Sequence, residues 1–200
     1  MRLVVPKRAL LRIVCWTRRL FVTAAIILLA NCGYVLLDAW IFQAREQRRL
    51  DRLVNNQQAP GVTSRPVPAA GLVGRIEIPR LDLSVMVAEG VEPTTLRRAA
   101  GHIPGTALPG QPGNVGIAGH RDTLFRPLRN IRRDDLITLI TPQGEYRYRV
   151  VSTRIVNPRD IAVLAPSRNE VLTLVTCYPF YFVGSAPDRF IVRAERVGRT

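Results

Sequence analysis

A chain of 200 residues has room for one domain of ordinary size with an appendage, and too few residues for two domains with independent cores. Hydrophobic residues make up 47% and charged residues 22%, and the 14 Gly and 15 Pro follow no period, which excludes collagen-like, coiled-coil and wholly disordered chains. The net charge of +14 comes almost entirely from arginine, and it leaves nucleic acid, an anionic membrane surface and an acidic polymer open as partners.

The first predicted element is a membrane-spanning helix over residues 20–42, preceded by a basic segment at residues 1–19. The basic segment holds six cations and no acid, and residues 20–37 carry no formal charge. At about 1.5 Å per residue, a helix continued to Phe42 covers a hydrocarbon core of roughly 30 Å. The sequence therefore predicts a single-pass membrane anchor.

Two kinds of processed leader are the alternatives to a retained anchor. A cleaved signal peptide needs a small-residue cleavage site, and none follows the apolar run before the charged stretch begins. A lipoprotein site at residues 29–32 would need a small residue where the bulky Asn31 stands. Six cations before the helix against four after it, the latter offset by two acids, place the N-terminus in the cytoplasm and the rest of the chain outside.

Residues 43–71 are predicted to form a polar helical extension followed by a flexible linker, because residues 55–71 concentrate Asn, Gln, Pro, Gly and Ala without an apolar period. Residues 72–200 then form the main domain. Short apolar or alternating runs, separated by turn residues, occur at 73–79, 83–89, 114–120, 135–141, 145–156, 170–177 and 189–197. This pattern predicts an all-β domain, a closed or nearly closed β-barrel or a sandwich, with short helical turns near 93–98 and 124–131.

The three cysteines cannot all pair with one another, which excludes a disulfide framework. Cys15 and Cys32 fall in the cytoplasmic or membrane segment, so Cys177 is alone in an exported domain, where an unpaired thiol invites a functional explanation. It ends the run VLTLVT, and a side chain at a strand end can be held rigidly and still reach a cleft. Composition alone favours a buried small hydrophobe, since free cysteine is among the most buried residue types.

A histidine favours the functional interpretation of Cys177 over that of a buried small hydrophobe. A free thiol is mostly protonated at neutral pH, so nucleophilic work needs a neighbouring base or cation, and histidine suits that task. His120 ends the apolar segment NVGIAGH at 114–120. A lone histidine is more often structural than catalytic, and the sequence does not show that His120 meets Cys177. His102 lies among turn residues and is interpreted as a loop histidine that makes local hydrogen bonds.

Acyl transfer also needs hydrogen-bond donors or positive charge at the developing oxyanion. Arg189 opens the last predicted strand twelve residues after Cys177, which is enough chain for a loop that turns back and pairs an adjacent strand. Its guanidinium would then lie near the thiol with five fixed donors. The alternative is a surface arginine paired with Asp188.

Together these residues carry a resemblance. The segment TLVTC at 173–177, preceded by GIAGHRD at 116–122 and followed by RFIVRA at 189–194, resembles the sortase family of membrane-anchored cysteine transpeptidases. The likeness extends over about residues 73–197, and the stretch GHIPGTALPGQPGNVGIAGHRDTLF is most similar to the class D or class E groups.

The resemblance implies a fold, a reaction and a set of roles. The family fold is an eight-stranded β-barrel, so one strand is missing from the seven runs, and the run at 145–156 or the stretch at 161–166 is expected to hide it. Cys177 would be the nucleophile, His120 the general acid/base, and Arg189 the residue that positions substrate and stabilises the oxyanion. The family cleaves an LPXTG-type sorting signal through a thioacyl enzyme, and an amine of a cell-wall precursor or protein resolves it.

No cofactor or metal is expected. The two histidines are eighteen residues apart without a cysteine ligand pattern, and no acidic cluster suggests the calcium that some family members bind. The expected partners are a sorting-signal-bearing protein, the amine acceptor and the membrane. Nucleic acid is not expected, since the cations of residues 59–200 form no long run. Two other classes stay open: another Cys/His acyl-transfer enzyme of the L,D-transpeptidase kind, and a noncatalytic anchored binding module.

Overall fold

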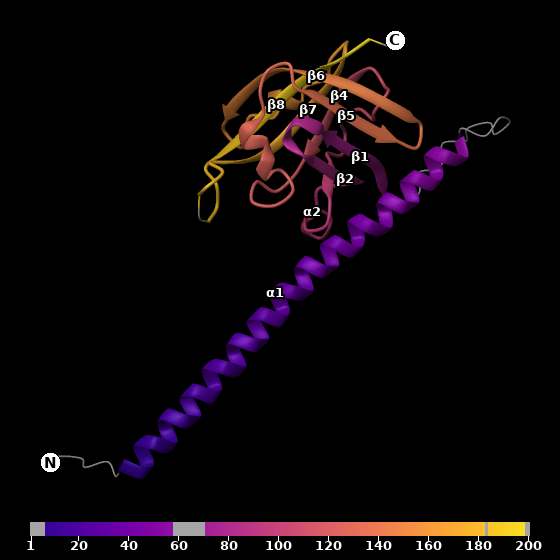
Figure 1. The fold of residues 1–200 in the computed structure, drawn as a ribbon. Coiled ribbons are helices and arrows are strands. Elements are labelled where there is room, and N and C mark those ends of the chain that lie inside the picture. The colour runs from indigo at the N-terminus through magenta and orange to yellow at the C-terminus, as the bar shows by residue number, and fades with distance from the viewer. Residues whose placement is uncertain (1–6, 58–70, 183, 199–200) are drawn as a thin grey trace. The chain divides into compact units, whose positions relative to one another are not determined.

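The computed structural model describes residues 7–57, 71–182 and 184–198, and the chain divides into two units, Met1–Ile41 and Phe42–Thr200. The first unit is helical in its described part, and the second contains a β-barrel (Figure 1). The linker predicted at residues 55–71 falls mostly on residues 58–70, which lie outside the described residues.

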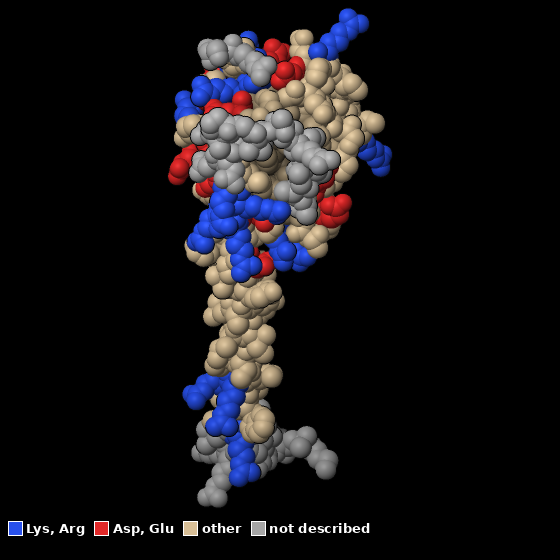
Figure 2. All heavy atoms as spheres, turned by 90° about the vertical axis from the view of Figure 1, so that its right-hand side faces the viewer, with Lys and Arg blue, Asp and Glu red and all other residues tan. Residues whose placement is uncertain are grey.

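Helix α1 (Lys7–Gln57) contains one stretch, within Val14–Val54, that is long and apolar enough to cross a membrane, and no residue of that stretch is buried. Its apolar side chains have no protein to pack against in this unit. Along the helix the uncharged stretch is flanked by Arg side chains at either end (Figure 2). The expected apolar N-terminal helix is therefore confirmed as a candidate membrane span.

Eight strands close into a barrel, which confirms the predicted all-β fold. The strands are β1 (Leu72–Ile78), β2 (Leu83–Glu89), β3 (Ala100–His102), β4 (Gly113–Ala118), β5 (Leu136–Thr141), β6 (Gly144–Val156), β7 (Glu170–Tyr178) and β8 (Asp188–Arg196). Their order around the barrel is β1-β2-β3-β4-β7-β8-β6-β5, and β5 pairs with β1 to close it. The pairs β2–β3 and β4–β7 are parallel, and the other pairs are antiparallel.

The eighth strand is β3, and the sequence-based expectation for its place was wrong. The run at 145–156 is one strand, β6, with a register shift between Val150 and Ser152, and the stretch at 161–166 contains the 3-10 helix η3 (Ile161–Leu164). Strand β3 has three residues, too few to show an alternating pattern. The other short helical elements are η1 (Pro79–Leu81), α2 (Pro93–Leu96) and η2 (Arg126–Asn130).

The core fills the barrel with the inward-facing side chains of the strands. On β7, Leu172 and Leu174 are fully buried and belong to this core, while the alternate residues face outward. Tyr148 of β6 is also fully buried, and that burial raises its pKa to about 12. Its hydroxyl has no hydrogen-bond partner among the described residues.

The last part of helix α1 packs against the outside of the barrel, within the second unit. Leu50 is fully buried and forms an apolar cluster with Leu72 of β1 and Met86 of β2. The Gln43 side chain accepts a hydrogen bond from the Met86 backbone at 2.9 Å, and Asp51 lies 3.5 Å from Arg75. The sequence predicted a helix here but not this contact.

An ion pair joins the turn after β1 to the residue that precedes β5. Arg80 of η1 donates to both carboxylate oxygens of Asp135, with Nη2 at 2.6 Å from Oδ2. Asp135 is buried and also accepts a hydrogen bond from the Arg132 backbone at 2.7 Å. The hydrogen bond from Arg80, followed by that from Arg132, lowers the pKa of Asp135 below its usual value despite burial.

Candidate active site

Cys177 lies near the end of β7, half-buried, with its thiol unpaired. The side chains of Leu172 and Leu174 fill the barrel core, so alternation directs Cys177 to the outer side of the sheet. A residue there is held by strand pairing on both sides, because β7 lies between β4 and β8. The strand end expected from the sequence is therefore confirmed.

Arg189, the second residue of β8, is paired directly with Cys177 in the antiparallel β7–β8 register. Cross-strand partners project to the same side of a sheet. The Arg189 guanidinium donates to the backbone carbonyl of Asp188 at 3.0 Å and to that of Ala186 at 3.3 Å. It therefore caps the end of the loop between β7 and β8, and the ion pair with the Asp188 carboxylate that the sequence left open does not form.

His120 lies two residues beyond β4, on the other side of β7. The parallel β4–β7 register runs to the pair Ala118 and Val175, and the next residue continues it: the Gly119 backbone donates to Val175 at 3.1 Å. The Thr176 hydroxyl donates to the Gly119 carbonyl at 2.7 Å. A register continued by one more residue brings the backbone of His120 beside that of Cys177.

The side chain of His120 is exposed. His120 and Cys177 are both described residues, and their side chains are not hydrogen-bonded to each other. Catalytic hydrogen bonds are often long or misaligned without substrate and tighten in the complex. The strand geometry thus brings His120, just beyond β4, to the same end of the barrel as Cys177 on β7 and Arg189 on β8.

Gly119 explains how the chain turns sharply after β4. A Cβ at this position would lie 2.6 Å from the Phe125 ring, so any side chain there would require the buried ring or the backbone to shift. The Phe125 backbone in turn donates to the His120 carbonyl at 2.9 Å. Residues 119–125 are therefore a tight turn whose shape sets the direction of His120.

Arg121 is a residue of this region for which the sequence predicted no role. Its side chain is 9% exposed, and Nη2 donates to the carbonyls of Phe182 at 2.7 Å and Gly184 at 2.9 Å. Arg121 thereby ties the turn that carries His120 to the loop that follows Cys177. Nothing in its sequence context distinguishes it from the other arginines, because its partners are backbone carbonyls some sixty residues away.

Aromatic rings pack beside the end of β7. Phe180 lies edge-on to Tyr178 and to Phe190, with ring centroids 6.2 and 5.3 Å apart. Such pairs stabilise the packing of the loop against β8 beyond the area that they bury. They give the Cys177 region a rigid apolar flank.

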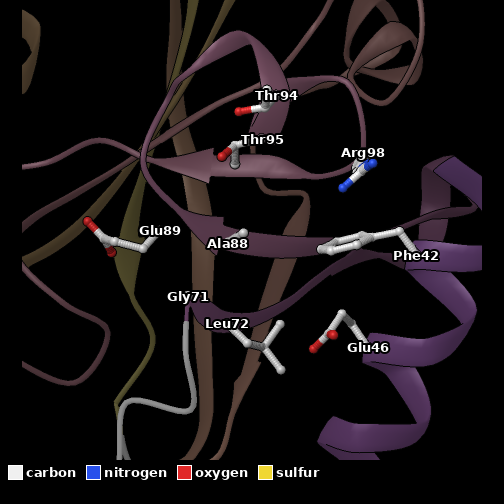
Figure 3. Close-up of a pocket in the computed structure, with 9 residues that line it drawn as sticks. All are labelled: Phe42, Glu46, Gly71, Leu72, Ala88, Glu89, Thr94, Thr95 and Arg98. Carbon is white, nitrogen blue, oxygen red and sulfur yellow. The ribbon is translucent and has the colours of Figure 1, made fainter. Parts of the chain in front are cut away.

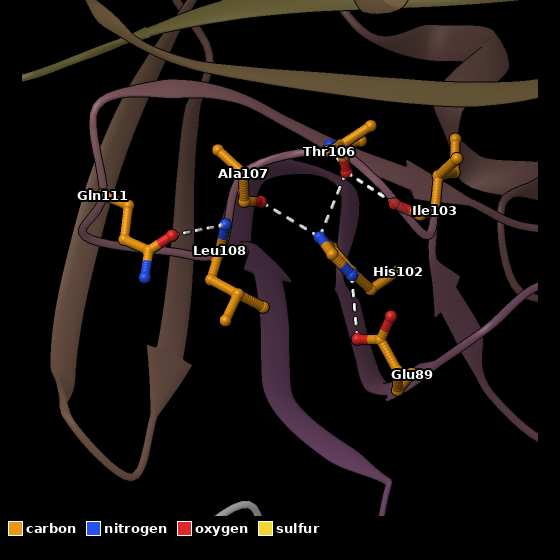
Figure 4. A network of polar contacts seen from close by, with 8 residues as sticks. Glu89, His102, Ile103, Thr106, Ala107, Leu108 and Gln111 are labelled. Carbon is orange, nitrogen blue, oxygen red and sulfur yellow. Dashed lines mark hydrogen bonds and ion pairs between the residues drawn. The ribbon is translucent and has the colours of Figure 1, made fainter. Parts of the chain in front are cut away.

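His102 is part of a separate polar network (Figure 4). It ends β3 and is 2% exposed, so it is a strand residue rather than the loop residue expected from the sequence. Its Nδ1 lies 2.8 Å from a Glu89 carboxylate oxygen, and its Nε2 lies 3.0 Å from the Ala107 carbonyl and 3.1 Å from the Thr106 hydroxyl. The local bonds expected for His102 are present, and the contact with Glu89 adds a link to β2.

Both ring nitrogens of His102 face acceptors. The Thr106 hydroxyl also donates to the Ile103 carbonyl at 2.7 Å. The ring is therefore linked both to Glu89 on β2 and to the segment that follows β3. Its role is to hold the segment between β3 and β4, away from the Cys177 end of the strands.

A pocket of about 250 Å³ lies between the end of helix α1, strands β1 and β2, and helix α2 (Figure 3). Its walls include Phe42 and Glu46 of the helix and Arg98 after α2. None of His120, Cys177 and Arg189 lines it. Among the described residues, no three His, Cys, Asp or Glu side chains are grouped so that they could hold a metal ion.

Comparison with known proteins gives one consistent result. The family model described as Sortase domain matches residues 76–197. The chain is 35% identical over 125 residues to Sortase D of Bacillus subtilis (strain 168), an alignment that covers 62% of this chain and 63% of that protein. It is 30% identical over 129 residues to Sortase A of Listeria monocytogenes, covering 60% and 58%. The aligned part thus spans less than two thirds of either relative.

Solved structures show the same fold. Sortase A from Corynebacterium diphtheriae superposes with a TM-score of 0.60 at 32% identity, covering 76% of this chain and 69% of that one. A Clostridium perfringens Sortase D5 transpeptidase gives a TM-score of 0.61 at 24% identity, covering 78% and 96%. The second likeness concerns the fold alone.

Proposed function

This chain belongs to the sortase family and resembles its class D members, and we propose that it is a membrane-anchored cysteine transpeptidase. In this proposal it cleaves an LPXTG-like sorting signal and transfers the cleaved protein to an amine of a cell-wall precursor or of another protein. The observation that supports it best is the β4–β7–β8 register, in which Cys177 is paired with Arg189 and the chain of His120 runs alongside.

The chemistry proceeds in two displacements. The Cys177 sulfur attacks the carbonyl carbon of the Thr–Gly bond, and the carbonyl oxygen becomes an oxyanion within reach of Arg189. The C–N bond then breaks, and protonated His120 gives its proton to the leaving amine. In the second displacement an acceptor amine attacks the thioester, His120 takes its proton, and the Cys177 thiolate leaves.

The active form in this scheme is a thiolate–imidazolium pair of Cys177 and His120. The pH–rate profile should therefore show two limbs, one from each group. Full activity wherever Cys177 alone is ionised, without a limb from His120, would contradict the assigned role of the histidine.

The proposal also includes a topology. Helix α1 anchors the chain, the basic residues 1–19 lie in the cytoplasm, and the barrel lies outside, where sorting signals and wall amines meet.

The test uses the full-length protein in detergent micelles, since the helix residues 42–54 pack on the barrel. The protein is incubated with a library of LPXTG-like peptides and, in a separate reaction, with wall peptides, and any adduct is located by mass spectrometry. A thioacyl adduct on Cys177 that is lost in Cys177→Ala is expected. Absence of any adduct would favour the noncatalytic binding module, and an adduct formed with wall peptides but not with sorting signals would favour an enzyme of the L,D-transpeptidase kind.

A further inference from the structure

The outer surface of β7 and β8 carries a second arginine site besides the one at Cys177. Thr173 lies four residues before Cys177 on β7 and projects to the same side, because Leu172 and Leu174 project into the core. In the β7–β8 register Thr173 is paired with Arg193, as Cys177 is paired with Arg189.

Strand β6 adds a further arginine to this surface. Ile191, between the two β8 arginines, is paired with Arg154, and Arg193 is paired with Ser152. Because cross-strand partners project to one side, Arg154 and Arg193 flank the same spot.

These side chains line a small pocket, which we call the arginine pocket. Its volume is about 30 Å³, enough for a group a few atoms across such as a carboxylate. Its lining residues are Ser152, Arg154, Val163, Thr173, Ile191 and Arg193.

The two arginines of the pocket have no partners among the described residues. Within the part of the chain that the structure describes, neither Arg154 nor Arg193 makes a side-chain hydrogen bond or an ion pair, and Glu195, two residues along β8, does not pair with Arg193. By contrast, Arg147 and Arg196 at the other end of the same strands are paired with Glu145 and Glu170. Two unpaired guanidiniums around one pocket favour an anion, which would accept charge-assisted hydrogen bonds from both.

The wall of the pocket is held in place by a buried amide. Asn114 of β4 is 2% exposed, and its Nδ2 donates to the carbonyls of Val163 at 3.1 Å and Ala165 at 3.3 Å. Its Oδ1 accepts from the Thr173 hydroxyl at 2.7 Å. Asn114 thus fastens η3 to both β4 and β7, so the arginine pocket exists before any ligand arrives, which lowers the entropic cost of binding.

The distance to Cys177 relates the pocket to a peptide substrate. Four residues along a strand span about 13 Å, which is the length of about four residues of an extended peptide. On this basis, and resting on the proposed function, we propose that the arginine pocket binds an acidic side chain of the sorting-signal peptide, about four residues from the scissile bond.

The experiment measures kcat/KM of the full-length enzyme for paired peptides that carry Glu or Gln at one position. The pair of residues is moved through each position of a peptide with an otherwise neutral LPXTG-like core, the core positions included. At the position that reaches the pocket, Glu is expected to give about ten-fold higher kcat/KM than Gln. Because the pocket is partly open, that ratio should fall as salt is added.

Enzyme variants then test whether the preference for Glu over Gln depends on the arginine pocket. Arg154→Gln and Arg193→Gln should each bring the Glu/Gln ratio toward one. Arg149→Gln is the matched control: it is an exposed arginine of the same strand β6, removes the same charge, and should leave the ratio unchanged. Because the readout is a ratio within one enzyme preparation, partial loss of folded protein does not affect it.

Two results would overturn the inference and leave the proposed function standing. One is equal turnover of Glu and Gln peptides at every position, with the neutral core cleaved normally. The other is a preference for Glu that survives in the double variant Arg154→Gln/Arg193→Gln. If no peptide forms an adduct with Cys177, the proposed function fails, and the inference fails with it.

Discussion

The barrel is stabilised differently on its two sides. On the side of β4 and β7, the buried contacts outside the core are polar: Asn114, Thr173 and Thr176 are nearly inaccessible, and each is hydrogen-bonded across strands or to a loop. On the side of β1 and β2, the contact with helix α1 is apolar, with Leu50 buried against Leu72 and Met86.

The difference matters because the two kinds of contact do different work. Hydrogen bonds are directional, so they determine where a loop lies relative to a strand. Apolar burial is roughly proportional to area and has no preferred direction, so it attaches one element to another without fixing its details. Changes on the β4–β7–β8 side are therefore expected to reduce activity, and changes on the helix side are expected to reduce stability.

The largest expected effect is on turnover. Arg189→Lys keeps the positive charge opposite Cys177 but loses the planar fork of donors, and we expect kcat/KM for a sorting-signal peptide to fall about 100-fold. The thermal midpoint should stay close to that of the wild type, because Arg189 bonds only to carbonyls of its own loop among the described residues. Near-normal turnover would rule out the role assigned to Arg189.

The next effect is on stability and comes from the helix side. Leu50→Ala removes a fully buried side chain and should lower the free energy of unfolding by about 2–4 kcal/mol, measured by denaturant titration of the full-length protein in micelles. Arg48→Ala, on an exposed part of the same helix, is the control and should change it little. Unchanged stability in Leu50→Ala would mean that the helix does not hold to the barrel through this cluster.

Replacing Asn114 should affect both stability and peptide turnover. Asn114→Ala leaves the Thr173 hydroxyl and two loop carbonyls without their partner, which should cost about 2 kcal/mol of stability. It should also raise KM for the peptide more than it lowers kcat, since η3 loses its attachment. Asn157→Ala is the comparison, because it removes an exposed side chain that accepts a hydrogen bond within a turn. A KM change as large in that variant would show that the effect is not specific to the hydrogen bonds of Asn114.

The smallest effect is a pH dependence on the far side of the barrel. The pKa of Asp135 is lowered in the folded protein, chiefly by the hydrogen bond from Arg80, so the folded state binds fewer protons than the unfolded state at moderately acid pH. The resulting stability is present above the unfolded pKa of about 4 and is lost as the pH falls through the lower folded value.

Denaturation at a series of acid pH values measures this dependence. Stability should decline on acidification more steeply in the wild type than in Asp135→Asn. Peptide turnover at neutral pH should stay similar, because Asp135 immediately precedes β5, and β8 and β6 separate β5 from β7 around the barrel. Parallel acid curves for the two proteins would show that Asp135 does not contribute.

Local patterns sufficed for much of the fold. Alternating apolar residues predicted seven strands, and most of their predicted ends lie within one or two residues of the observed ends. The uncharged run predicted the candidate membrane span. These signals are readable because each residue's exposure follows from its own neighbours in the chain. Strand β3 escaped because three residues containing a glycine show no period.

The candidate site was predictable in part. Cys177 and Arg189 could be placed opposite each other because they belong to one hairpin, and the structure pairs them. Their catalytic roles, with that of His120, stay predictions. Arg121, Asn114 and the arginine pocket were not predictable, since their partners lie about forty to sixty residues away or on other strands.

The sequence by itself determined the type of each segment: an apolar helix, a run of short strands, and a cysteine, a histidine and an arginine at strand ends. The tertiary structure decided which segments meet. Parts distant in the chain are joined by the parallel pairing of β4 with β7, by the packing of residues 42–54 on β1 and β2, and by the hydrogen bonds of Asn114. Such contacts depend on how the whole barrel closes, and no short stretch of sequence encodes them, because their stability arises only when every strand is in place.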